Sequence, residues 1–249
     1  MFESRLALAS LSGEADAEWA KAGAEWVGAA FLGGVCLDEP TREAARVMVV
    51  DRDRSEFLPP DPIAFIDKQL GALESVDIRA GINVRSTTPE PVREAASVAA
   101  EHGAMLEINA HCRQAELCEA GCGETLLRNP SRLEALIGAA AEAGADVSVK
   151  VRAELPAVDL VFVAQRLERA GADAIHVDAM DSASVVREIS DATSLFVIAN
   201  NGVRDRETAR AYLDYGADAV SVGRPSDDPA VLSGVEDAVS EWFSQEGEL

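Results

Sequence analysis

Four side chains able to bind a metal or to react as nucleophiles lie close together in the middle of the chain: His111, Cys112, Cys118 and Cys122. The cysteine spacing, C-x5-C-x3-C, matches none of the familiar zinc or iron–sulfur ligand sets, and the fourth cysteine, Cys36, is distant in the sequence. Cys112 directly follows the strand-like end of an apolar run, where a reactive thiol is well placed. We therefore predict no metal site and a single chemically active cysteine, Cys112.

A lysine inside an apolar run is the second unusual feature, because the chain has only three lysines. Lys150 lies in the run Ser148-Val149-Lys150-Val151-Arg152, where strand alternation places Lys150 and Ser148 on one face and the valines on the other. An inward lysine needs an anionic partner, which a phosphate or an electron-rich cofactor ring could supply. A structural carboxylate, Glu107 or Asp178, is the alternative partner.

Glycines follow the last two apolar runs of the chain. Asn200-Asn201-Gly202 comes after one run and Gly223-Arg224 after the next. Backbone N–H groups beside such glycines can converge on an anion, and this is where parallel β/α barrels usually bind phosphate. Gly202 and Gly223 could instead serve only as turn residues. The presence of both sites favours a phosphate-bearing ligand.

The apolar runs that carry these residues are short and nearly continuous, as in strands buried on both faces. Amphipathic segments rich in Ala, Glu and Arg separate them. The eight runs are Leu6–Ser10, Trp26–Phe31, Ile78–Val84, Met105–Asn109, Val147–Val151, Ala174–Asp178, Leu195–Ala199 and Ala219–Val222. This alternation predicts an α/β fold, a single parallel (β/α)8 TIM barrel over residues 1–249, with an open doubly wound sheet as the runner-up. The segment at about 33–62 is expected to form a helix and an irregular excursion over the barrel mouth.

Active sites of such barrels lie at the carboxyl ends of the strands, so the polar residues that end each run form the candidate site. These residues are Ser10, Asn83, Asn109, Cys112, Lys150, His176, Asp178, Asn200, Asn201, Gly202, Gly223 and Arg224. Because the strands are parallel, the sequence predicts that all of these residues meet at one end of the barrel.

Acidic residues outnumber basic ones by 44 to 22, which gives a formal net charge of −22. The acids are spread along the chain, a distribution typical of extreme halophiles, in which high salt screens self-repulsion. No basic patch indicates nucleic-acid binding, and no apolar run is long enough to span a membrane. The N-terminus lacks a signal-peptide pattern, and the four cysteines fit a reducing compartment, so a cytoplasmic protein is expected.

The order of these motifs resembles the dihydrouridine synthase family. Glu107-Ile108-Asn109-Ala110-His111-Cys112, followed by Gly121-Cys122-Gly123-Glu124-Thr125-Leu126-Leu127, is similar to the family signature of an acidic residue, Asn and Cys before a G-x-G-x-x-L-L helix start. The similarity continues to Val222-Gly223-Arg224 and covers roughly residues 78–225. The chain resembles most a short archaeal branch of barrel proteins related to those synthases, within an FMN-dependent group that includes dihydroorotate dehydrogenases.

The resemblance implies an FMN cofactor, with its phosphate near Asn200–Gly202 and Gly223-Arg224 and with Lys150 near the isoalloxazine ring. In the family, reduced FMN delivers hydride to C6 of a uracil and the motif cysteine protonates C5, so Cys112 is the expected general acid and Asn109 a positioning group. The family's flavin-side glutamine corresponds to Asn83. Its histidine after the sixth strand falls on Asp178, and His176 lies two positions earlier on the same face.

The chain departs from the family pattern at several positions. The family's Gly-Cys-Pro reads His111-Cys112-Arg113 here, and Leu8-Ala9-Ser10-Leu11 stands where the family has a Pro-Met pair. The sequence also continues for only about 25 residues after Arg224, so the helical domain that grips tRNA in the family is expected to be missing. We therefore expect the fold and the flavin site to transfer better than the substrate, which is a uracil-containing molecule, either tRNA or a free pyrimidine.

Two other functions stay open on the sequence. One is a flavin-free barrel that acts on a sugar phosphate, with His111, Asp178 or Lys150 as acid–base groups. The other is a non-catalytic protein that binds flavin or phosphate and works with a partner. No motif identifies the electron donor, and the sequence leaves the oligomeric state open, a homo-oligomer included.

Overall fold

The computed structural model describes residues 1–52 and 54–246 of the chain. Eight parallel strands pair in sequence order, and β8 pairs with β1 to close the sheet. They are β1 (Leu6–Leu8), β2 (Ala29–Cys36), β3 (Arg79–Arg85), β4 (Met105–Asn109), β5 (Asp146–Arg152), β6 (Ala174–Asp178), β7 (Phe196–Asn200) and β8 (Ala219–Val222). The fold is the predicted (β/α)8 TIM barrel.

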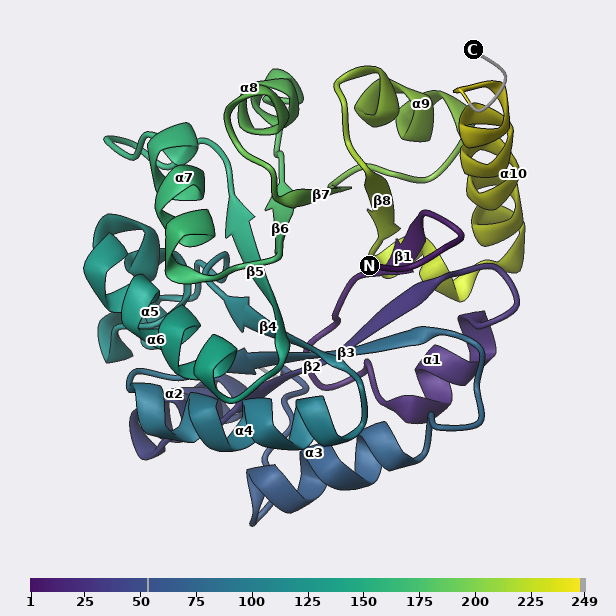
Figure 1. The fold of residues 1–249 in the computed structure, drawn as a ribbon. Helices are drawn as coiled ribbons and strands as arrows, with labels where there is room; N and C mark the ends of the chain where they lie inside the picture. Colours follow the sequence, from purple (N-terminus) through teal and green to yellow (C-terminus); the bar gives the residue numbers. More distant parts are fainter. Residues whose placement is uncertain (53, 247–249) are drawn as a thin grey trace.

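Helices surround the strands on all sides (Figure 1). One helix follows each strand: α1 (Ala17–Gly23), α3 (Pro62–Gly71), α4 (Pro89–Glu101), α6 (Pro130–Glu142), α7 (Leu160–Ala170), α8 (Ser184–Ala192), α9 (Arg206–Asp214) and α10 (Pro229–Glu246). Added to these are α2 (Glu39–Arg52), α5 (Ala115–Ala120) and two short 3-10 helices, η1 (Gly123–Arg128) and η2 (Arg224–Asp227). Side-chain caps begin several of the helices, as where Asp205 and Thr208 form a capping box at α9.

The barrel interior is layered along its axis. Apolar side chains fill it toward the amino ends of the strands, where Phe31, Met105 and Ile198 are fully buried. Above them lies a layer of polar side chains that are all fully buried: Asn83, Glu107, Ser148, His176 and Ser221. Above this polar layer the interior opens at the carboxyl ends of the strands. Layers of inward side chains are the usual filling of such barrels, but a fully buried polar layer must satisfy its own hydrogen bonds.

The segment at about 33–62 differs from the expectation at its start. Gly33–Cys36 continue β2, because Val35 and Cys36 pair with Val84 and Arg85 of β3 beyond an irregularity in the register. Helix α2 follows and packs against α5, and residues 54–61 then lead into α3. Gly34 is required in this strand, since a Cβ atom there would lie 2.6 Å from Asn83 Oδ1 and 3.2 Å from Arg85 Nε.

A buried ion pair fastens this segment to the barrel. The side chains of Arg85 and Glu56 are each only 1% exposed, and Arg85 Nη1 lies 2.6 Å from Glu56 Oε2. Arg85 Nη2 also donates a hydrogen bond to Ser12 Oγ, in the loop after β1. One guanidinium therefore holds two loops against the end of β3, because its separate N–H groups bond a carboxylate and a hydroxyl.

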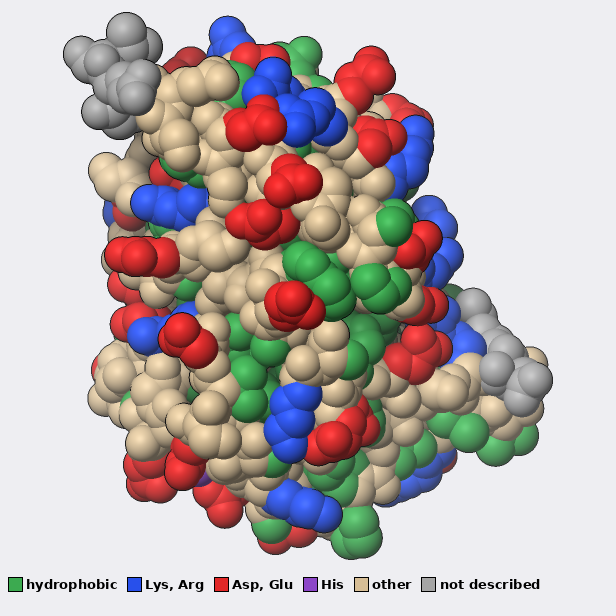
Figure 2. Space-filling model, turned by 90° about the vertical axis from the view of Figure 1, so that its right-hand side faces the viewer, with side chains coloured by type: hydrophobic (Ala, Val, Ile, Leu, Met, Phe, Trp, Pro, Cys, Tyr) green, Lys and Arg blue, Asp and Glu red, His purple; other side chains and the backbone are tan. Residues whose placement is uncertain are grey.

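Acidic side chains are scattered over the surface rather than gathered into one patch, as the face drawn in Figure 2 shows. Many of the exposed acids pair with arginines, as Glu241 does with Arg206 and Arg210. Within the described residues, no helix has the length and apolar composition needed to cross a bilayer.

The substitution Arg85→Met is expected to destabilise the protein by about 3–5 kcal/mol, because it removes the buried hydrogen-bonded partner of the Glu56 carboxylate and leaves only the more distant Arg54, at 3.8 Å. Arg79→Met is the matched control. Arg79 pairs with Asp146 at a site where the two side chains are 31% and 47% exposed, so its loss should change the free energy of unfolding by about 1 kcal/mol or less. Denaturant unfolding of the three proteins at one salt concentration measures this, and equal losses would contradict it.

Candidate active site

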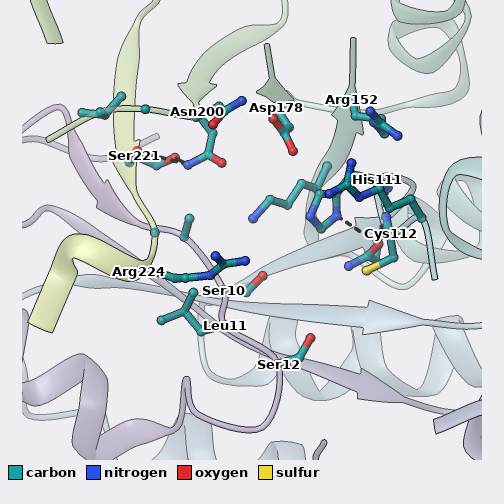
Figure 3. A pocket seen from close by; sticks show the side chains of 18 of the residues that line it. Ser10, Leu11, Ser12, His111, Cys112, Arg152, Asp178, Asn200, Ser221 and Arg224 are labelled. Atoms are coloured by element: carbon teal, nitrogen blue, oxygen red, sulfur yellow. Dashed lines mark hydrogen bonds between the residues drawn. The ribbon is translucent and has the colours of Figure 1, made fainter. Parts of the chain in front are cut away.

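A cavity of about 830 Å³ opens at the carboxyl ends of the strands. That volume lies within the usual range for cofactor and small-molecule sites. Figure 3 shows side chains from opposite sides of the barrel pointing into it: Cys112 and His111 follow β4, Asn200 ends β7, and Arg224 follows β8. The convergence follows from the parallel strands, which bring residues far apart in sequence to one rim.

Most of the predicted site residues line this cavity. They are Ser10, Asn109, Cys112, Lys150, Asp178, Asn200, Asn201, Gly202, Gly223 and Arg224. Asn83 and His176 do not line it: both are fully buried in the polar layer beneath. Strand alternation gave the correct face for these two residues but not their depth along the barrel axis.

The cavity reverses the charge balance of the protein. Its lining includes six cationic residues, Arg54, Arg113, Lys150, Arg152, Arg204 and Arg224, against two acidic ones, Glu14 and Asp178. The whole chain has twice as many acidic as basic residues. Clustered cations in a concave site raise the local concentration of anions, so this lining indicates an anionic ligand.

Three of these cations have no acidic partner in the described part of the chain. No carboxylate of those residues lies within 4.0 Å of the charged nitrogens of Arg113, Lys150 or Arg224, whereas Arg152 pairs with Glu124 at 2.6 Å. Lys150 is 2% exposed, and neither Glu107 nor Asp178, its alternative structural partners, is within ion-pair distance. A nearly buried, unpaired ammonium group is costly unless a ligand supplies the counter-charge.

The backbone of Cys112 is fixed from two sides. Its N–H donates to Asn109 Oδ1 at 3.1 Å, and its carbonyl accepts from Glu124 N at 2.8 Å. Gly123 packs against that carbonyl with φ +63°, a position where a Cβ atom would collide with the Cys112 oxygen. The thiol of Cys112 therefore lies at a defined place in the cavity wall, 6% exposed.

The other three cysteines do not line the cavity. Cys36 and Cys122 pack in a buried cluster with Ala45 and Met48, and Cys118 donates a weak hydrogen bond to the Cys112 carbonyl at 3.6 Å. Burial raises the pKa of the Cys36, Cys118 and Cys122 thiols, which keeps them protonated and unreactive near neutral pH. No cluster of three His, Cys, Asp or Glu side chains able to hold a metal is found among residues 1–52 and 54–246.

A family model described as dihydrouridine synthase matches residues 81–246, about two thirds of the chain. The chain belongs to the dihydrouridine synthase family. The match begins in β3 and includes Asn109, Cys112, Lys150 and Arg224, whereas β1, β2 and the segment that carries Arg54 precede it.

Individual relatives agree with this assignment. An uncharacterised protein of Methanocaldococcus jannaschii is 26% identical over 234 residues, covering 89% of each chain. The tRNA-dihydrouridine synthase B of Klebsiella pneumoniae is 28% identical over 214 residues, which is 79% of this chain and 66% of the synthase, so the match spans about two thirds of the synthase. A chain of the tryptophan synthase complex from Pyrococcus furiosus superposes with a TM-score of 0.60 at 14% identity. The superposition covers 96% of this chain and 100% of the tryptophan synthase chain, and at this identity it shows the shared fold alone.

In this member of the dihydrouridine synthase family, the polar layer carries one buried negative charge. Burial by itself raises the pKa of Glu107, but His176 and Lys150 more than offset this effect and the pKa lies below its usual range. Burial lowers the pKa of His176, and the attraction to Glu107 only partly opposes it. Glu107 is thus ionised and His176 neutral near pH 7. From the sequence, Glu107 was expected as a possible partner for Lys150 and as the acidic residue of the family signature, and Ser221 was not among the predicted site residues, although strand alternation places both on the inward face.

The histidine pKa shifts predict two opposite behaviours in one titration. His102 Nε2 lies 2.8 Å from Asp67, and His102 Nδ1 lies 3.0 Å from Glu74. The hydrogen bond to Asp67 raises the pKa of His102, so this ring should titrate above about 6.5. Burial, together with the cations Lys150 and Arg85, lowers the pKa of His111, and burial lowers that of His176, so neither ring should titrate near 6.5.

Proton NMR of the three imidazoles between pH 5 and 8.5 measures these shifts, with His102→Gln assigning one resonance. Because His176 is neutral when folded and gains a proton when unfolded below about pH 6.5, its contribution to stability is present above that pH and is lost as the pH falls. His102 contributes in the opposite sense: its stabilisation is present at low pH and is lost as the pH rises through its folded pKa. A His176 resonance that titrates at about 6.5 would mean that this ring is solvated in the folded protein.

Proposed function

We propose that the protein is an FMN-dependent oxidoreductase that reduces the C5=C6 bond of a uracil base. The observation that carries the proposal is the meeting of Cys112, Asn109 and the unpaired Lys150 in one cationic cavity, in a chain of the dihydrouridine synthase family. A thiol, an amide and an ammonium group beside a phosphate-accepting rim are the groups that a flavin reduction of a pyrimidine requires.

The residues present fit FMN. The cavity volume suits a cofactor together with a base, and Lys150 and Arg224 lack acidic partners within the described structure. Arg224, Gly223 and Gly202 would hold the phosphate, and Lys150 would lie against the electron-rich part of the ring system. Ser10 and Asn200 supply further polar contacts from β1 and β7. When bound and reduced, the flavin supplies the hydride.

Cys112 is proposed as the general acid. Its Sγ–H would give a proton to C5 of the base as C6 gains the hydride, and the resulting thiolate would regain a proton from solvent. Asn109 would position the base, while its Oδ1 holds the Cys112 backbone. His111 is neutral in this cavity, so it can accept or donate a hydrogen bond without adding to the positive charge.

The charge of the cavity supports a phosphate-bearing substrate. The relatives named as synthases act on tRNA, and we propose a tRNA uridine as the substrate, with a free pyrimidine as the alternative. Arg113 and Arg54 line the cavity in addition to the residues assigned to the cofactor, and Arg113 has no acidic partner among the described residues. A free base carries no phosphate for these cations to bind, whereas a polynucleotide does.

The visible spectrum of the purified chain tests the proposal first. Purified in high-molar KCl, the protein is expected to be yellow and to release stoichiometric FMN on denaturation. A colourless protein that also fails to bind added FMN would overturn the redox mechanism. That result would leave the barrel as a binder of another phosphorylated ligand, such as a sugar phosphate, with the neutral His111 as its candidate base.

Cys112→Ala is expected to lower kcat by roughly 10²–10⁴-fold, the usual contribution of a positioned acid, while FMN stays bound. Reduction of uridine in unmodified tRNA and of free uracil, each followed by loss of the pyrimidine absorbance, measures the effect and separates the two substrates. Cys118→Ala is the matched control, because this thiol is close to Cys112 but does not line the cavity. Unchanged turnover in Cys112→Ala would remove Cys112 from the mechanism.

A further inference from the structure

The buried polar layer beneath the cavity forms one continuous chain of hydrogen bonds. Glu107 of β4 lies at its centre, and the chain reaches the cavity wall on both sides. Glu107 has no exposed surface, and its carboxylate faces three donors: Asn83, Ser148 and His176. A carboxylate can only accept hydrogen bonds, so it determines the direction of every bond that follows.

On one side the chain runs to Cys112. Asn83 Nδ2 donates to Glu107 Oε1 at 2.7 Å, which turns Asn83 Oδ1 toward Asn109. Asn109 Nδ2 donates to that oxygen at 2.9 Å, which in turn leaves Asn109 Oδ1 to face the loop after β4. There it accepts from the backbone N–H of Cys112 at 3.1 Å. The carboxylate sets the orientation of Asn83, and through Asn83 it supports the Asn109 orientation in which Oδ1 accepts from the backbone N–H groups of His111 and Cys112.

On the other side the chain runs to Asn200. His176 Nδ1 lies 2.7 Å from Glu107 Oε2, so this nitrogen carries the proton and Nε2 must be an acceptor. Ser221 Oγ lies 2.7 Å from Nε2 and donates to it. Asn200 Nδ2 then donates to Ser221 Oγ at 2.8 Å, and Asn200 lines the cavity. Asn200 Nδ2 also donates to the Ser221 carbonyl at 3.1 Å, so this series of bonds acts on the Asn200 side chain where β7 meets β8.

We propose that Glu107 is a positioning residue that fixes Cys112 and Asn200 from beneath the cavity through the direction of these hydrogen bonds. The effect of Glu107 on turnover rests on the proposed function. Its effect on the two arms, the series of hydrogen bonds that runs to Cys112 and the series that runs to Asn200, does not. Lys150 lies in the cavity above this carboxylate, outside ion-pair distance, so the two opposite charges attract without a direct bond.

Glu107→Gln separates this role from simple packing, because glutamine has nearly the same shape but offers one acceptor and one donor group. One arm must then reverse. Either the new NH2 group faces His176, which moves the ring proton from Nδ1 to Nε2, or it faces Asn83. In the second case the side-chain amides of Asn83 and Asn109 both rotate by half a turn. The NH2 group of Asn109 then faces the Cys112 N–H, which loses its hydrogen-bond acceptor.

Two measurements on the flavin-free protein follow the two arms. Nitrogen-15 NMR of the imidazoles reports which nitrogen of His176 carries the proton, and peptide mass spectrometry after alkylation reports the reactivity of Cys112. In Glu107→Gln we expect either proton transfer to Nε2 or a roughly 2- to 13-fold rise in the alkylation rate, the change expected from the loss of one hydrogen bond. Ser148→Ala is the matched control, since Ser148 Oγ donates to the same carboxylate at 3.3 Å but leads to neither arm.

The proposal would be overturned if, in Glu107→Gln, His176 keeps its proton on Nδ1 and the rate of Cys112 alkylation is unchanged. Should that variant fail to fold, the wild-type spectrum decides, because a His176 that carries its proton on Nε2 contradicts the arrangement. In the flavin-loaded enzyme the variant is expected to lower kcat about tenfold with FMN stoichiometry unchanged, and an unchanged kcat would remove the role in turnover. A colourless, inactive protein with the expected NMR and alkylation results would refute the proposed function and leave the positioning role intact.

Discussion

The interior of a closed eight-stranded barrel is too narrow to hold bulk water, so every polar side chain that points into it must find its partner among its neighbours. In this protein the Glu107 carboxylate meets that constraint for a whole layer. The carboxylate accepts hydrogen bonds from Asn83, Ser148 and His176. Each amide or imidazole bonded to it must therefore point a donor toward it, which fixes the orientation of that group. A network satisfied in this way is rigid, because reversing one member leaves a donor facing a donor.

That rigidity is transmitted upward to the cavity. Two of the strands that carry the buried layer, β4 and β5, also carry Asn109 and Lys150, two residues closer to the barrel mouth, and Ser221 of the layer holds Asn200 at the end of β7. The strongly acidic composition does not reach this site, where six cations face two carboxylates. In molar salt the Debye length falls to about 3 Å, so long-range attraction contributes little, and a ligand must be selected by direct contact with groups such as Lys150. A nearly buried ammonium group retains its effect under those conditions because the surrounding protein excludes salt.

Much of this arrangement could be predicted from the sequence. The predicted strands Met105–Asn109, Ala174–Asp178 and Ala219–Val222 match the structure residue for residue. Short apolar runs bounded by helical segments define both ends of a buried strand. Depth could not be predicted. His176 is the register partner of Lys150, yet Lys150 reaches the cavity with its long side chain and His176 does not. Alternation determines which face a residue occupies, whereas its height depends on the stagger of all eight strands. The Arg85–Glu56 ion pair could not be predicted either, because Glu56 lies in an irregular segment 29 residues away from Arg85 in the sequence.

The cavity wall is built from two parts of the chain with different relationships to the family. The side that carries Asn109, Cys112, Lys150 and Arg224 belongs to the segment that matches the family model, which begins at residue 81. Another part of the wall comes from Ser10, Ser12, Glu14 and Arg54, which precede that segment, and Arg85 holds it through Ser12 and Glu56. The cavity is thus completed by residues that lie outside the segment matched by the family model. Under the proposed function, a difference in substrate between this chain and other family members is expected to arise from this part of the wall rather than from the shared motifs, because Ser12 and Arg54 line the same cavity as Cys112 and Asn109.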